Sequence, residues 1–220
     1  MSLAVNQVLT NVFSLESEKR QRGTGFVVTR PGRQFLVTAA HGYSEDVDQI
    51  VRLRRFHDDQ AAEMLLRRVN PVEDGDDILI FELETQLEIP FVLPSIDDEG
   101  LRQGQDALIT GFPDVGASVT TTVSGLSFPT VLPMCKQGIV STMTRELLYI
   151  DVIANTGFSG SPVVYRHHDS GEIRIAGMVL KTVTEALTER GIAVEPYQAG
   201  GLSVCVSAHR LVAEFARSGV

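Results

Sequence analysis

The sequence has 220 residues, of which 43% are hydrophobic and 21% charged, as in ordinary soluble globular proteins. Its net charge of −9 argues against nucleic acid as a partner, because phosphate binding needs concentrated lysine and arginine. No run of 18 or more apolar residues occurs, so we expect no insertion into a membrane.

Turn residues divide the chain into short segments with strand character. A loose helix is predicted around 3–12, before the first of these segments. Ten apolar runs then follow, at 25–29, 35–38, 50–56, 78–83, 106–111, 138–141, 147–151, 162–165, 173–179 and 202–206. The turn 30–33 joins the first two runs as a hairpin, whereas the alternation in 50–56 leaves its buried face undecided. Many short strands at intervals of roughly ten residues favour a sandwich or a pair of barrels.

A helix is also predicted at the C-terminus, over 208–217. Its apolar residues Leu211 and Phe215 share one face, and Ser207 can cap the first turn. The acidic stretch 95–105 marks a weak division near the middle of the chain. The Thr-rich segment 118–133 is expected to be a long loop.

Two cysteines, Cys135 and Cys205, lie in apolar stretches without CxxC spacing or a nearby histidine. We therefore expect packed, reduced thiols and neither a metal site nor a cofactor. The run His167-His168-Asp169 is interpreted as a surface hairpin. The segment 23–25 is too short for a nucleotide-binding loop and leads into a strand.

Two motifs place a histidine and an aspartate beside strands. His41 follows the strand-like Val37-Thr38 and two alanines, where an imidazole can meet solvent. Asp77 directly precedes the buried run 78–83 and can accept a hydrogen bond from a histidine N–H. Asp76 is the alternative carboxylate.

The most specific motif is Asn155-Thr156-Gly157-Phe158-Ser159-Gly160-Ser161-Pro162. Glycines on both sides of Ser159 allow a tight turn, in which the N–H groups of Gly157 and Ser159 can converge on one point. Such a pair of donors forms an oxyanion hole. The alternative is a Gly/Ser turn that simply leads into a strand.

Together these motifs resemble the trypsin/chymotrypsin-like serine proteases, and most closely the protease domain of the HtrA (Deg) branch. The order His41, Asp77, Ser159 matches, with separations of 77 − 41 = 36 and 159 − 77 = 82 residues. Further similar segments are 23–28, 101–113, 138–141, 151–155 and 201–207, so the likeness spans about 23 to 215.

The resemblance implies an all-β fold of two six-stranded antiparallel barrels with a C-terminal helix. Residues 1–100 would form the barrel that carries His41 and Asp77, and 101–220 the barrel that carries Ser159 and the helix. The implied activity is that of a serine endopeptidase acting on proteins or peptides. The basic cluster Arg52, Arg54, Arg55, Arg67 and Arg68 would then lie on a solvated barrel surface.

The same family pattern places Ile153 at the floor of the primary substrate pocket, with Val179 and Leu180 on its wall, which predicts a preference for small or medium apolar side chains. Phe158 departs from the pattern, because trypsin-type zymogens have an acidic residue there that pairs with a new N-terminus. Ser161 replaces a commoner glycine.

Phe158 also keeps a second hypothesis open, in which the domain is inactive or latent and serves to bind peptides or partners. No PDZ domain is present, so the sequence either lacks that mode of regulation and oligomerisation or is one domain of a longer protein. A homo-oligomer or a partner domain fits both cases. The first 13 residues lack the features of a signal peptide, so we expect a cytoplasmic protein unless a leader was trimmed.

Overall fold

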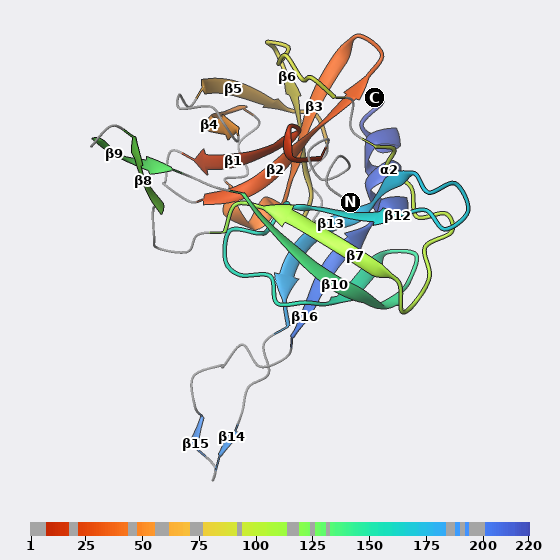
Figure 1. Cartoon of the computed structure of the whole chain (residues 1–220). Helices are drawn as coiled ribbons and strands as arrows, with labels where there is room; N and C mark the ends of the chain where they lie inside the picture. Colours follow the sequence, from red (N-terminus) through yellow and green to blue (C-terminus); the bar gives the residue numbers. More distant parts are fainter. Residues whose placement is uncertain are drawn as a thin grey trace.

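The computed structural model describes residues 8–17, 22–43, 48–55, 62–70, 77–91, 94–113, 119–123, 126–130, 133–183, 188–189, 192–193 and 201–220. Within them, two closed antiparallel barrels of six strands each lie side by side (Figure 1). The predicted fold class, with its C-terminal helix, is confirmed.

The first barrel closes in the strand order β1-β2-β3-β6-β5-β4, with β4 paired back to β1. Its strands are β1 (Val12–Ser17), β2 (Arg22–Arg30), β3 (Arg33–Thr38), β4 (Asp48–Arg55), β5 (Ala62–Arg68) and β6 (Leu79–Leu83). The predicted hairpin is formed by β2 and β3. The undecided face of β4 is resolved, because Val51 and Leu53 are buried while Arg52 is exposed and pairs with Glu63 at 2.7 Å.

Two strands of this barrel, β1 and β5, were not predicted from the sequence. The helix expected over 3–12 falls largely outside the described residues, and Val12 begins β1 instead. The sequence of β5, Ala62–Arg68, is rich in good helix formers and has little branched character. Pairing with β4 and β6 on both sides overrides that preference.

The second barrel closes in the order β10-β11-β16-β13-β12-β7. Its strands are β7 (Asp106–Gly111), β10 (Met134–Met143), β11 (Leu147–Asp151), β12 (Pro162–Arg166), β13 (Ile173–Thr182) and β16 (Leu202–Ser207). Two short hairpins stand outside the barrels: β8 (Val119–Val123) with β9 (Leu126–Thr130), and β14 (Thr188–Glu189) with β15 (Ile192–Ala193). The long loop expected over 118–133 is therefore a hairpin in part, since the two valines and three threonines of β8 are β-branched and suit an extended strand.

Helix α2 (Ala208–Arg217) packs into the core shared by both barrels. Ser207 caps it, accepting a hydrogen bond from the backbone N–H of Arg210 at 3.2 Å, as predicted. The fully buried Phe215 meets Phe35 of β3 edge-on, with ring centroids 5.8 Å apart. Residues from both barrels and from α2 belong to this one buried cluster, so the helix helps to fix the barrels against each other.

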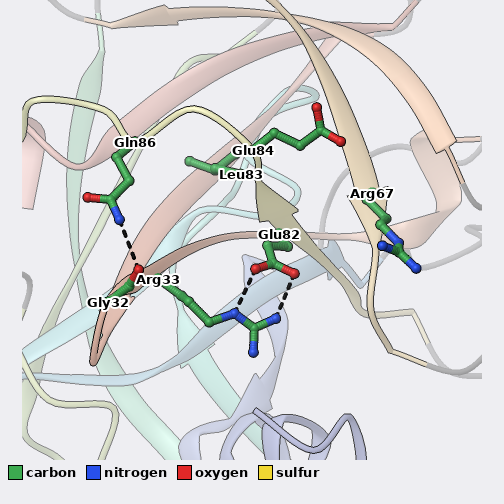
Figure 2. A pocket seen from close by; sticks show the side chains of 7 residues that line it. All are labelled: Gly32, Arg33, Arg67, Glu82, Leu83, Glu84 and Gln86. Atoms are coloured by element: carbon green, nitrogen blue, oxygen red, sulfur yellow. Dashed lines mark hydrogen bonds and ion pairs between the residues drawn. The ribbon is translucent and has the colours of Figure 1, made fainter.

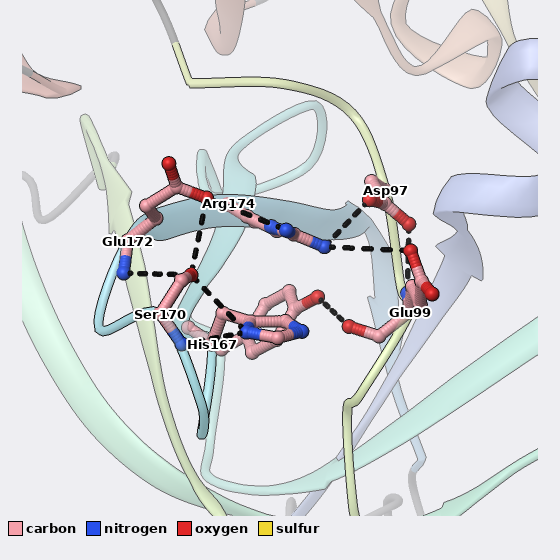
Figure 3. Close-up of polar contacts among 7 residues, drawn as sticks. Asp97, Glu99, His167, Ser170, Glu172 and Arg174 are labelled. Carbon is pink, nitrogen blue, oxygen red and sulfur yellow. Dashed lines mark hydrogen bonds and ion pairs between the residues drawn. The ribbon is translucent and has the colours of Figure 1, made fainter.

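The segment between the barrels is tied to β12 and β13 by backbone and side-chain contacts. Ile96 forms a parallel bridge with Ile175, and the Arg174 guanidinium pairs with Asp97 at 2.7 Å (Figure 3). The Tyr165 hydroxyl donates to the backbone carbonyl of Glu99 at 2.7 Å. Burial raises the pKa of Tyr165 to about 12, so the phenol remains a donor at neutral pH.

The two cysteines differ in their surroundings. Cys205 is fully buried and Cys135 is exposed, and both are free thiols. The expectation of two packed thiols is thus wrong for Cys135, because odd-numbered side chains at this end of β10 point outwards.

None of the described helices is long and apolar enough to cross a membrane.

Candidate active site

His41 lies just after β3, in a single helical turn formed by Ala40–Gly42. The strand positions the turn at the junction of the barrels, and the small, buried Ala39 lets the chain pass close to the second barrel. About half of the His41 side chain is exposed, with a relative accessibility of 49%. The imidazole can therefore exchange a proton with a bound molecule.

Asp77 precedes β6 and contacts His41 through both carboxylate oxygens. Oδ2 lies 2.7 Å from His41 Nδ1, and Oδ1 accepts from the His41 backbone N–H at 2.8 Å. Because a carboxylate can only accept, Nδ1 must carry the proton, which leaves Nε2 free to accept one. The alternative carboxylate, Asp76, lies outside the described residues.

Ser159 reaches the same imidazole from the second barrel. Its Oγ lies 3.0 Å from His41 Nε2, so one line of polar contacts joins Asp77, His41 and Ser159. Gly157 and Gly160 beside it have φ angles of +94° and +85°, which side chains adopt only with strain. A Cβ at Gly160 would also lie 1.9 Å from the backbone oxygen of Thr24. The sequence therefore needs glycine there to bring Ser159 against the first barrel.

The electrostatics of His41 favour its protonated form. Its pKa is raised above 6.5, chiefly by the hydrogen bond to Asp77, while burial and the positive charge of Lys181 act in the opposite direction. A histidine with this balance can take up a proton from a neighbouring hydroxyl and hold the resulting charge against the carboxylate.

In the backbone before Ser159, one hydrogen bond holds the peptide group between Gly157 and Phe158. The Phe158 N–H donates to the Asn155 carbonyl at 3.1 Å. Among the described residues, neither Gly157 N–H nor Ser159 N–H has a protein hydrogen-bond partner. Two unpaired donors two residues apart, one of them on the serine itself, suit a developing negative charge on a substrate oxygen.

Phe158 itself is fully buried in the core of the second barrel. The Lys136 ammonium lies 5.4 Å from the centre of its ring and donates to the backbone carbonyl of Ile153 at 2.6 Å. Lys136 also donates to the Asn155 side chain. Burial lowers the pKa of Lys136. An apolar ring, and not a carboxylate, therefore fills the space beneath this loop.

The three residues assigned to the substrate pocket have different environments. Ile153 is 39% exposed, Leu180 is partly buried, and Val179 is buried with 1% of its surface accessible. Val179 contacts the loop through its backbone, accepting from the Gly160 N–H at 2.8 Å. The role of the three in substrate selection remains a prediction.

Thr24 and Lys136 both contact the loop that carries Ser159, and neither was predicted from the sequence as a site residue. The Gly-Thr-Gly motif around Thr24 was part of the family resemblance, but its spacing says nothing about which distant backbone atoms the hydroxyl meets. No pattern in β10 distinguishes Lys136.

Two surface hollows lie away from these residues. One, of about 330 Å³, sits on the first barrel, where the Arg33 guanidinium binds both oxygens of Glu82 and Gln86 donates to the Gly32 carbonyl (Figure 2). The other, of about 380 Å³, lies beside 102–105 on the second barrel. Neither contains His41, Asp77 or Ser159. A protease has no need of a deep cavity at its site, because an extended peptide can bind along a strand edge.

A double barrel with a serine, a histidine and an aspartate in contact at the junction defines the class of chymotrypsin-like serine proteases. A family model described as "Trypsin-like peptidase domain" matches residues 23–172. The chain belongs to this family, which confirms the membership expected from the motifs, and it is a serine endopeptidase by that membership.

Solved structures show the same fold at low sequence identity. The inactive form of the Rv3671c protease superposes with a TM-score of 0.65 and 14% identity, covering 99% of this chain and 93% of that one. The inactive form of a serine-to-alanine mutant of Rv3671c from M. tuberculosis H37Rv superposes with a TM-score of 0.65 and 15% identity, covering 98% of this chain and 90% of that one. The serine endoprotease from Yersinia pestis superposes with a TM-score of 0.65 and 17% identity, covering 99% of this chain and 65% of that one. A search of curated proteins found no match.

Proposed function

We propose that Ser159, His41 and Asp77 form the catalytic triad by which this protein cleaves peptide bonds in proteins. The observation that carries the proposal is the pair of contacts on one imidazole, 2.7 Å from Nδ1 to Asp77 and 3.0 Å from Nε2 to Ser159. These three side chains come from segments that lie far apart in the sequence, and the half-exposed imidazole that joins them is accessible to a bound substrate.

In this mechanism Ser159 Oγ attacks the carbonyl carbon of the scissile bond and passes its proton to His41 Nε2. The oxyanion that forms accepts from the N–H groups of Gly157 and Ser159. The C–N bond then breaks, and His41 gives the proton to the departing amine. Water attacks the acyl-enzyme with His41 again as base, which releases the acid and restores Ser159. Asp77 holds the tautomer and stabilises the imidazolium.

We further propose that the residue before the scissile bond is apolar and small or medium in size. The apolar side chains of Ile153, Val179 and Leu180 support this preference, and the Leu180 carbonyl lies 2.9 Å from the Ser159 hydroxyl. A peptide library digested by the protein tests it. Cleavage mainly after lysine or arginine would overturn the proposed pocket without affecting the triad.

The first experiment is labelling with a fluorophosphonate probe, which reacts only with an activated serine. Wild type is expected to be labelled, and Ser159→Ala and His41→Ala are expected to lose labelling. Ser161→Ala is the matched control, since Ser161 is buried two residues away and its hydroxyl has no hydrogen-bond partner in the described part of the chain. A folded wild-type protein that is not labelled would favour the latent or peptide-binding hypothesis.

A further inference from the structure

A buried threonine of the first barrel contacts the loop that carries Ser159 in the second barrel. Thr24 lies on β2 and is fully buried. Its hydroxyl donates to the carbonyl of Gly157 at 2.7 Å, across 133 residues of sequence. Its backbone N–H donates to the carbonyl of Ser159 at 3.0 Å. One residue thus contacts both members of the predicted oxyanion hole.

The Thr24 hydroxyl is itself oriented by the second barrel. The backbone N–H of Phe112, just after β7, donates to Oγ1 at 2.8 Å. Since a hydroxyl has one proton and Oγ1 accepts from Phe112, that proton is directed to the Gly157 carbonyl. The carbonyl of Thr24 accepts from Thr38 at 2.7 Å, so its backbone is held as well.

These contacts fix one peptide group at both ends. The peptide between Gly157 and Phe158 has its carbonyl bound by Thr24 and its N–H bound by the Asn155 carbonyl. The peptides on either side carry the N–H groups of Gly157 and Ser159, for which the described ranges offer no hydrogen-bond partner. Gly157 has no side chain to restrict its rotation, so an external hydrogen bond is what can hold this peptide in one orientation.

The surrounding glycines make room for the contact. A Cβ at Gly111 would lie 2.9 Å from Thr24 Oγ1 and 3.1 Å from the Phe158 ring. Phe158 provides no polar atom beneath the loop, so Thr24 is the polar side chain that anchors it from the first barrel. The loop around Ser159 is therefore held by the hydrogen bond from Thr24 to Gly157, and not by an acidic side chain at position 158.

We propose that Thr24 is a positioning residue for catalysis. Its hydroxyl holds the loop around Ser159 in the orientation in which the N–H groups of Gly157 and Ser159 face a substrate oxygen. No cleavage of the chain is needed to form this arrangement. This inference rests on the proposed triad. It implies that the first barrel contributes to transition-state stabilisation through Thr24, separately from its contribution of His41 and Asp77.

The test compares Thr24→Val, which keeps the shape and removes the hydroxyl, with Thr24→Ser, which keeps the hydroxyl. For a peptide substrate, we expect kcat to fall about 10- to 100-fold in T24V, part of the loss caused by removing an oxyanion donor, with KM little changed. T24S should recover most of kcat. The midpoint of the acidic limb of kcat/KM should stay at the wild-type pH in both, because Asp77 and His41 are untouched.

Thr110→Val is the matched control, since Thr110 is also a fully buried strand threonine and, among the described residues, its hydroxyl has a hydrogen-bond contact only with the Cys135 thiol. Its kcat should stay within about threefold of wild type. If T24V does not fold, Thr24→Ala and Thr24→Ser provide the same comparison, because both lack the methyl group and they differ only by the hydroxyl.

A folded T24V, or T24A, with wild-type kcat would overturn the role of Thr24 while leaving the triad standing. A fall in kcat that Thr24→Ser does not recover would also overturn it, because the hydroxyl would not be the cause. Failure of the triad itself is recognised separately, as absence of fluorophosphonate labelling in folded wild type.

Discussion

The hydroxyl of Ser159 donates to the backbone carbonyl of Leu180 at 2.9 Å. The same hydroxyl lies 3.0 Å from His41 Nε2, and its single proton can serve only one of the two acceptors. Leu180 is the extra residue of a bulge in β13, where the register to β16 shifts between Val179 and Lys181. The bulge turns this carbonyl towards the serine. Before Ser159 attacks a substrate, its hydroxyl proton must therefore rotate from the Leu180 carbonyl to His41.

We expect Asp77 to be the carboxylate that orients His41 and Asp76 to be unnecessary for activity. Asp77→Asn should reduce kcat about 10³- to 10⁴-fold, because the amide cannot hold the His41 tautomer that leaves Nε2 free. Asp76→Asn is the matched control and should stay within threefold. Steady-state kinetics on a peptide substrate decide between them. A larger loss in D76N than in D77N would reassign the carboxylate.

The pH dependence of kcat/KM follows from the charges around His41. Protonated His41 cannot act as base, and its pKa is raised above 6.5 mainly by Asp77, so activity should fall on acidification already above pH 6.5. Lys181 lowers this pKa, so Lys181→Gln should move the acidic limb to higher pH. Profiles of wild type and variant between pH 5 and 9 test the sign. A shift of the K181Q limb to lower pH would contradict it.

Phe158 should contribute mainly to stability. It is fully buried in the second core, so Phe158→Ala is expected to lower the free energy of unfolding by about 3–5 kcal/mol. Phe158→Leu, which keeps most of the apolar volume, should cost less. Phe158→Asp would move a carboxylate into this apolar core, and its desolvation, even with the Lys136 ammonium nearby, should destabilise the protein most. Denaturant titration measures all three, and equal stability of F158D and F158L would refute this account of the site.

Substitution of Gly160 and of Gly104 by alanine distinguishes the cost of backbone strain from the cost of steric overlap. The two glycines have similar φ angles, +85° and +81°, so the strain is similar at both positions. A Cβ at Gly104 meets nothing within 4 Å, so Gly104→Ala should cost only the strain of about 1–2 kcal/mol. At Gly160 the Cβ would overlap the Thr24 carbonyl. Gly160→Ala should therefore be clearly more destabilising and should also abolish fluorophosphonate labelling, whereas G104A should retain it. Similar unfolding free energies for the two variants would speak against the overlap.

Much of this site was readable from the sequence because its chemistry is local. A histidine after a strand, an aspartate before one and a serine between glycines are short patterns, and each is visible within a few neighbouring residues. The strands with alternating or branched residues, such as β3 and β6, were recognised for the same reason. Strand β5 was missed because its residues prefer helix when considered alone.

The remaining features depend on contacts between segments that are distant in the chain. Barrel closure pairs β1 with β4, and packing of Phe215 against Phe35 brings the last helix against the third strand. The contact of Thr24 with Gly157 spans 133 residues. The sequence by itself determined which residues could perform the chemistry. Only the tertiary structure decided which backbone groups meet them, because a hydrogen bond across the barrel junction leaves no periodic pattern in either partner segment.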